Sequence, residues 1–143
     1  MIKIRDIMTV EIDVVDPETN IQDAAEKMKE LGIGIIPICQ NHNLIGMLTD
    51  RDIIVRAVAE KKEPLHTPVQ EVMTQNVIMA YEDQDIEEAE RLMSHHQSRR
   101  LPIVNQSNLF VGMLTLGDLA SRSPKEFAGE VLEEVSQPSK PSR

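Results

Sequence analysis

An internal duplication constrains the fold of this chain more than any other feature of its sequence. At an offset of about 65 residues, the second half repeats apolar and turn residues of the first. Met8-Thr9 recurs as Met73-Thr74, and Gly46-Met47-Leu48-Thr49 recurs, after one inserted residue, as Gly112-Met113-Leu114-Thr115. The repeat is too long for a solenoid unit and fits a small duplicated domain. The inserted residue falls at a predicted turn, where insertions are tolerated.

Each copy has the pattern of a β-α-β-β-α unit. Amphipathic helices are expected from Ile21 and from Ile86, because apolar residues follow at helical spacing. A last helix should start after Thr49 or Thr115. The expected strands are 13–15, 35–39 and 44–49 in the first copy, and 78–81, 101–104 and 109–115 in the second. One copy alone would bury little surface. We therefore expect an α/β (α+β) fold in which two pseudo-symmetric repeats pack sheet to sheet.

The predicted domain boundaries follow the repeat. Residues 1–66 form the first domain and residues 67–124 the second. Residues 60–68 are charged and carry two prolines, so they are expected to be a linker. Residues 125–143 are predicted to be a C-terminal helix and a disordered tail.

Composition and charge exclude several classes of function. The net charge of -9 disfavours nucleic acids and anionic membranes, although it allows a small anionic ligand. No apolar run is long enough to span a membrane, no signal-peptide pattern is present, and Cys39 is the only cysteine. A cytoplasmic protein is therefore expected. Adjacent helical residues such as His95-His96 do not chelate easily, so no metal site is predicted.

The segments Thr49-Asp50-Arg51-Asp52 and Thr115-Leu116-Gly117-Asp118 are the candidate binding sites. Each places Thr at the end of an apolar strand and Asp three residues later. In one interpretation the Thr side holds a phosphate and the Asp accepts hydrogen bonds from a ribose diol. In the other, Thr-x-x-Asp is a capping box that only ends the helix. No nucleophile with a base and no phosphate-binding glycine loop is evident, so no catalysis is expected.

The duplicated Met-Thr pairs, the Pro37 and Pro102 strands and the Gly-Met-Leu-Thr-x-x-Asp segments resemble the CBS domain pattern over residues 5–120. The resemblance extends to stand-alone bacterial CBS pairs, and it implies an adenine-nucleotide site in the cleft between the repeats. The implied ligands are AMP, ADP, ATP or S-adenosylmethionine, bound as regulatory ligands rather than as cofactors. The implied contact residues are Thr49, Arg51, Asp52, Thr115, Asp118, Arg99 and Arg100, with Ile12, Asp13, Ile33, Gly34, Ile35, Asn76, Ile78 and Ser98 framing the base.

The two candidate sites are not equivalent in sequence. Arg99 and Arg100 precede the second proline strand, whereas Gly34 and Ile35 precede the first. We therefore expect unequal affinities. A nucleotide sensor is the favoured function, with a ligand-independent dimerisation or interaction scaffold as the alternative. By the same resemblance, two chains are expected to form a flat homodimer through the helices, with an unknown protein as a further partner.

Overall fold

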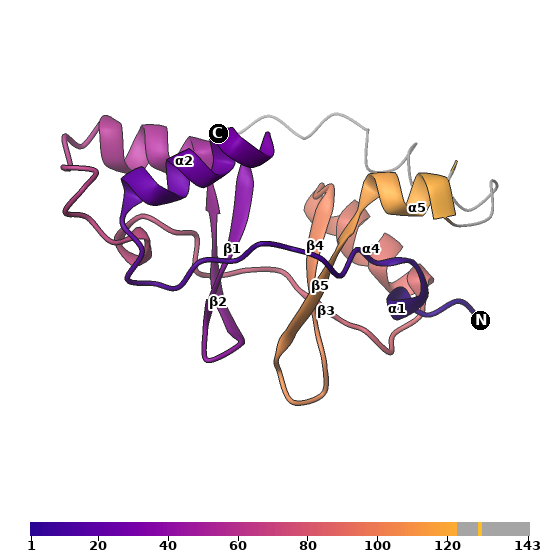
Figure 1. Ribbon diagram of the computed structural model, residues 1–143. Helices are drawn as coiled ribbons and strands as arrows, with labels where there is room; N and C mark the ends of the chain where they lie inside the picture. The colour runs from indigo at the N-terminus through magenta and orange to yellow at the C-terminus, as the bar shows by residue number, and fades with distance from the viewer. Residues whose placement is uncertain (123–128, 130–143) are drawn as a thin grey trace. The chain divides into compact units, whose positions relative to one another are not determined.

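The computed structural model describes residues 1–122 and residue 129, and the chain forms two compact units (Figure 1). Unit 1 comprises residues 1–12, 78–107 and 111 onward, and unit 2 comprises residues 13–77 and 108–110. The predicted C-terminal helix and tail, residues 125–143, fall outside the described residues except for Gly129.

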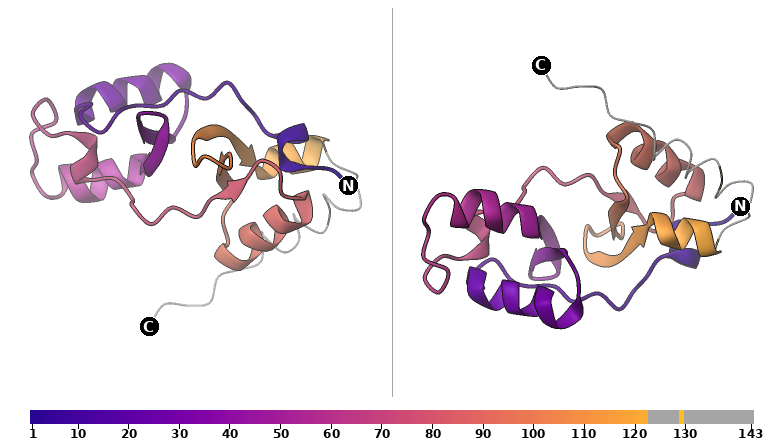
Figure 2. Two further views of the ribbon diagram at one scale, coloured as in Figure 1. Left: turned by 90° about the horizontal axis from the view of Figure 1, so that it is seen from below. Right: turned by 90° about the horizontal axis from the view of Figure 1, so that it is seen from above.

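Unit 2 contains helix α2 (Ile21–Leu31), the antiparallel strands β1 (Ile35–Gln40) and β2 (Asn43–Thr49), α3 (Asp50–Asp52), the π-helix η1 (Ile53–Val58) and the 3-10 turn η2 (Val69–Glu71). The Asn20 side chain caps α2 by accepting from the Asp23 N–H at 2.8 Å. Gly32, with φ 66°, ends it in the left-handed region. Figure 2 shows the β1–β2 hairpin end-on between α2 and the helical segment formed by α3 and η1.

Unit 1 contains α1 (Ile4–Ile7), β3 (Ala80–Tyr81), α4 (Ile86–His96), β4 (Arg100–Val104), β5 (Phe110–Thr115) and α5 (Leu116–Arg122). The strand order is β3-β4-β5, and β3 pairs in parallel with β4. In both views of Figure 2, α1 lies beside α5. The predicted β-α-β-β-α order is confirmed in this unit. In unit 2 the first strand is reduced to a single bridge, in which Val15 pairs with Ile38.

The two sequence repeats exchange the segments that precede them. The amide of Thr9 donates to the Met113 carbonyl at 2.9 Å, and the amide of Met113 donates back to Thr9 at 2.9 Å. Thr74 and Met47 make the equivalent pair, at 2.8 and 3.0 Å. The first twelve residues therefore pack with the second repeat, and the segment around Thr74 packs with the first. The repeat boundary at residue 66 stays a prediction, because these compact units are composed differently.

Two glycines let the exchanged segments approach the central strands. A Cβ added at Gly112 would lie 2.8 Å from the Thr9 carbonyl oxygen. A Cβ at Gly46 would lie 2.9 Å from the Thr74 carbonyl oxygen and 2.6 Å from the Met73 sulfur. Both glycines are therefore required by close packing of backbone on backbone.

Each unit has its own core, built from aliphatic and methionine side chains. The core of unit 2 contains the α2 face expected from the sequence (Ile21, Ala24, Met28), together with Val69 and Val72 of the exchanged segment. Leu31, the last residue of α2, is 46% exposed. The core of unit 1 includes Ile4, Ile7, Met8, Ile86, Ala89, Met93, Leu101, Ile103, Leu114 and Leu119.

The predicted linker is packed against the start of α2. The amides of Ile21 and Gln22 donate to the carbonyls of Thr67 and Pro64, at 3.0 and 3.2 Å. Thr67 is buried, and its hydroxyl donates to the Glu63 carbonyl at 2.7 Å. Within the described residues, the longest helices are far too short and too polar to cross a bilayer.

Candidate functional site

Both Thr-x-x-Asp segments form complete capping boxes. In unit 2 the Thr49 amide donates to Asp52 Oδ2, and the Asp52 amide donates to Thr49 Oγ1, both at 3.0 Å. In unit 1 the pair Thr115 and Asp118 repeats these bonds at the same distances. The capping interpretation is therefore realised in the fold, and the ribose-binding role of the two aspartates stays a prediction.

Each aspartate has a second partner from the exchanged segment. The Thr9 hydroxyl donates to Asp118, at 3.1 Å from Oδ1 and 3.3 Å from Oδ2. The Thr74 hydroxyl lies 3.2 Å from both oxygens of Asp52. Both carboxylates are buried, with 7–8% of each residue exposed. Each Thr of the duplicated Met-Thr pair thus holds the helix cap of the other repeat.

Arginines, missed by the sequence reasoning, support the same arrangement. Arg56 donates from Nη1 to the Met73 carbonyl at 3.1 Å, and its Nε lies 3.9 Å from Asp52 Oδ1. Arg122 donates from Nη1 to the Ile7 carbonyl at 3.2 Å. Arg56 and Arg122 occupy equivalent positions of the two repeats, so the duplication itself contained the signal for them.

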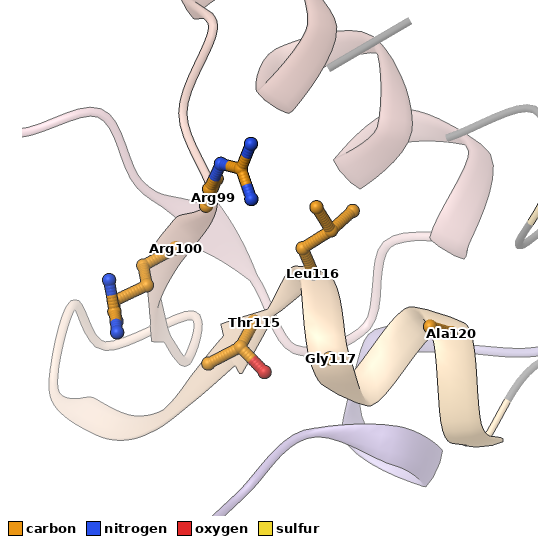
Figure 3. A pocket seen from close by; sticks show the side chains of 6 residues that line it. All are labelled: Arg99, Arg100, Thr115, Leu116, Gly117 and Ala120. Carbon is orange, nitrogen blue, oxygen red and sulfur yellow. The ribbon is translucent and has the colours of Figure 1, made fainter. Parts of the chain in front are cut away.

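The candidate site in unit 1 is a cavity of about 400 Å³ beside the end of β5 (Figure 3). It brings together three of the predicted residues, Arg99, Arg100 and Thr115, with Leu116, Gly117 and Ala120. Figure 3 shows the two guanidinium groups pointing to different sides of their strand. Arg99 lies next to Leu116, whose amide donates to the Arg99 carbonyl at 2.8 Å. The volume lies in the range of small-ligand pockets, and both arginines are exposed.

The other predicted residues of unit 1 do not line this cavity. Ser98 braces the Arg100 backbone, because its hydroxyl donates to the Arg100 carbonyl at 2.7 Å. Asp118 faces Thr9 instead of lining the cavity. Ile12 is the last residue of the N-terminal segment of unit 1, and Ile78 is the first residue of its second segment, residues 78–107. Ile78 is exposed and Ile12 is half-buried.

Unit 2 holds the remaining predicted residues. Gly34 and Ile35 lie opposite the end of β2, where the Asp50 amide donates to the Gly34 carbonyl at 2.9 Å. Asp13 lies 3.9 Å from Lys27 Nζ. Asn76 lines a cavity of about 320 Å³, which also contains Arg56 and Thr74. Ile33 and Arg51 are exposed.

Cys39 lies in β1 of unit 2, and its thiol is buried. Burial raises the pKa of the Cys39 thiol to about 11, so it is protonated at neutral pH and is a poor nucleophile. Within residues 1–122 and 129, no group of three or more His, Cys, Asp or Glu side chains is arranged to hold a metal ion.

Comparisons with known proteins identify the family. The CBS domain model matches residues 4–58 and 69–125. The chain is 43% identical over 137 residues to the CBS domain-containing protein YhcV of Bacillus subtilis, covering 95% of this chain and 96% of that protein. Among solved structures, Hypoxic Response Protein I with two coordinated zinc ions matches with a TM-score of 0.77 and 32% identity, covering 86% of this chain and 100% of the other.

A second solved structure, CBSX2 in complex with AMP, matches with a TM-score of 0.73 and 26% identity, covering 84% of this chain and 94% of the other. The family model covers both repeats, and the YhcV match covers nearly the full length of both proteins. This chain is therefore a member of the CBS domain family with two tandem CBS repeats.

Proposed function

We propose that this protein is a non-catalytic sensor of adenine nucleotides, and that the cavity of unit 1 binds the phosphate groups. The observation that carries the proposal is that Arg99, Arg100 and Thr115 all line one cavity of about 400 Å³. Guanidinium groups bind phosphate through charge-assisted hydrogen bonds. The AMP bound to CBSX2, which shares the fold and 26% identity, supports an adenine nucleotide as the ligand class.

The buried aspartates are proposed to contact the ribose. An ionised carboxylate offers about four acceptor sites, and Asp118 uses them for one amide and one hydroxyl of its own chain. Acceptor capacity is therefore left for a ribose hydroxyl. The Thr9 hydroxyl shares its hydrogen bond between Oδ1 and Oδ2 of Asp118. A bound ribose diol would therefore compete with Thr9 for these two oxygens.

Ligand size sets the expected affinity. A mononucleotide has about two dozen heavy atoms, and each contributes roughly 0.3 kcal/mol in ligands of this size. The sum of about 7 kcal/mol corresponds to a dissociation constant on the order of 10 μM. Such a site would change occupancy over micromolar changes in nucleotide concentration, and ligand-dependent population shift would then carry the signal to a partner.

Calorimetric titration with AMP, ADP, ATP and S-adenosylmethionine tests the proposal. At least one of these ligands should bind with micromolar affinity. Arg99→Gln should weaken the binding of the phosphate-bearing nucleotides about tenfold and should leave the affinity for adenosine unchanged. Arg91→Gln is the matched control, because Arg91 is also exposed in unit 1 but pairs with Glu88. Equal losses for Arg99→Gln and Arg91→Gln would mean that only net charge matters. No heat with any ligand at millimolar concentration would refute the sensor.

A second candidate function, association of two chains as a scaffold, is favoured by exposed apolar side chains in unit 2. Ile54, Val55 and Val58 of η1 are 61%, 45% and 63% exposed, and Leu31 at the end of α2 is 46% exposed. Apolar groups of this size on a helix are typical of interfaces. We propose a homodimer through these helices. Light scattering should give twice the chain mass, and the double substitution Ile54→Lys/Val58→Lys should give a monomer.

A further inference from the structure

The wall of the unit 1 cavity and its counterpart in unit 2 carry different charges. The repeat alignment pairs Arg99 with Gly34, Arg100 with Ile35, Leu116 with Asp50 and Gly117 with Arg51. Two positive charges therefore line the wall in unit 1. The counterpart positions in unit 2 hold one positive and one negative charge, which sum to zero.

The two units make the same backbone hydrogen bond at these positions. Leu116 donates from its amide to the Arg99 carbonyl at 2.8 Å, and Asp50 donates from its amide to the Gly34 carbonyl at 2.9 Å. The residues compared thus occupy equivalent places in the fold, and the difference between the walls comes from their side chains.

The Asp50 carboxylate occupies the space that an arginine side chain would need. A Cβ added at Gly34 would lie 2.9 Å from Asp50 Oδ2. The other oxygen, Oδ1, accepts from the Arg51 amide at 2.8 Å, which holds the carboxylate in place. At the place where unit 1 has the Arg99 side chain, unit 2 therefore has the negative charge of Asp50, held by a hydrogen bond.

We propose that Asp50 is a specificity-determining residue that excludes phosphate from unit 2, so that each chain binds one nucleotide polyphosphate, in unit 1. This inference rests on the proposed nucleotide-binding function and assigns its phosphate site to one repeat. A carboxylate within several ångströms of a phosphate repels it, and the repulsion is only partly screened at a protein surface. Removing the Asp50 charge should therefore raise the affinity of unit 2 for phosphate about tenfold.

Site-resolved NMR tests this assignment. Inorganic tripolyphosphate and ATP are titrated separately into ¹⁵N-labelled full-length protein. The backbone amides at positions 99 and 116 report on unit 1, and those at positions 34 and 50, whichever residue is present, report on unit 2. In the native chain, only the unit 1 amides should shift at micromolar ligand. In Asp50→Leu, which installs the counterpart residue, and in Gly34→Arg/Asp50→Leu, the unit 2 amides should shift as well.

Control variants separate this charge effect from others. Asp50→Asn keeps the shape of the side chain and should give part of the gain. Asp23→Asn removes another exposed carboxylate of unit 2, in the first turn of α2, and should leave the unit 2 amides without a ligand-induced shift. If unit 1 shifts but unit 2 stays silent in the double variant, the inference about Asp50 is wrong and the nucleotide site survives. If both units of the native chain bind equally, Asp50 excludes nothing. If the unit 1 amides never shift, the phosphate site itself is refuted, and the inference with it.

Discussion

Replacing Asp118 by alanine should lower the free energy of unfolding by about 3 kcal/mol. The buried carboxylate accepts from the Thr115 amide at 3.0 Å and shares the Thr9 hydroxyl between its oxygens at 3.1 and 3.3 Å. A hydrogen bond to a charged acceptor contributes roughly 1.5–3 kcal/mol. Thr9 is half-buried, so water can replace part of its hydrogen bond to Asp118. The combined contribution of the two hydrogen bonds is therefore placed at the lower end of its range, about 3 kcal/mol. The Thr115 hydroxyl can still accept from the amide of residue 118, so that half of the cap is retained.

The measurement is urea unfolding at pH 7, followed by circular dichroism. Asp118→Asn keeps one acceptor oxygen and should cost about half as much as alanine. Asp52→Ala should match Asp118→Ala, because Thr49 and Thr74 repeat the same bonds. Asp23→Ala, at an exposed position in α2, should cost less than about 0.5 kcal/mol.

The refuting result is a loss below about 0.5 kcal/mol for both alanine variants. The capping box and the bond to the exchanged segment would then contribute nothing, although both carboxylates are buried. The burial of these carboxylates and their two native donors predict that the alanine variants are destabilised. An alanine variant that binds no nucleotide is therefore informative only if its fold is shown to persist.

The remaining predictions concern backbone and burial. Gly112→Ala should lower the free energy of unfolding by about 1–2 kcal/mol, because its Cβ would lie 2.8 Å from the Thr9 carbonyl oxygen. Gly117→Ala should stabilise α5 by up to about 1 kcal/mol, because its Cβ would meet nothing closer than 3.5 Å. The melting temperatures of the two variants should therefore shift in opposite directions. Gln97 adopts φ 52° at the end of α4, where the other repeat has Gly32 at φ 66°, so Gln97→Gly should raise stability by about 0.5–1 kcal/mol and Gly32→Ala should lower it by a similar amount in the same assay. The Cys39 thiol should react slowly with a disulfide reagent at pH 8 and rapidly in urea. Because burial raises the pKa of this thiol to about 11, its contribution to stability is present below pH about 9 and is lost as the pH rises toward 11. Melting temperatures measured as a function of pH would detect this loss. Rapid labelling of the folded protein would contradict that burial.

The duplication made most of the fold predictable. Strands expected at 35–39 and 101–104 are found at Ile35–Gln40 and Arg100–Val104, because apolar runs between turn residues mark strands directly. The first strand of each repeat was less predictable. Val15 pairs at one bridge only, and β3 has two residues, since these segments are held by neighbours distant in sequence.

The exchange of segments could not be found from the repeat pattern. Thr9 pairs with Met113 and Asp118, more than one hundred residues away, whereas the pattern places Thr9 in the first copy. Local periodicity carries no information on which copy a segment packs against. The equivalent of each contact exists in both copies, so exchanged and unexchanged pairings satisfy the same sequence pattern.

The same symmetry decides which residues can report on function. Thr49 with Asp52 and Thr115 with Asp118 are identical pairs with the same hydrogen bonds, and duplication preserves a helix cap as well as it preserves a binding site. Substituting them changes stability and any ligand contact together. Arg99 and Asp50 are exposed, and the other repeat has a different residue at each equivalent position, Gly34 for Arg99 and Leu116 for Asp50. A change in nucleotide binding when either side chain is replaced by its counterpart, at constant stability, would therefore arise from the charge at the cavity wall and not from the fold.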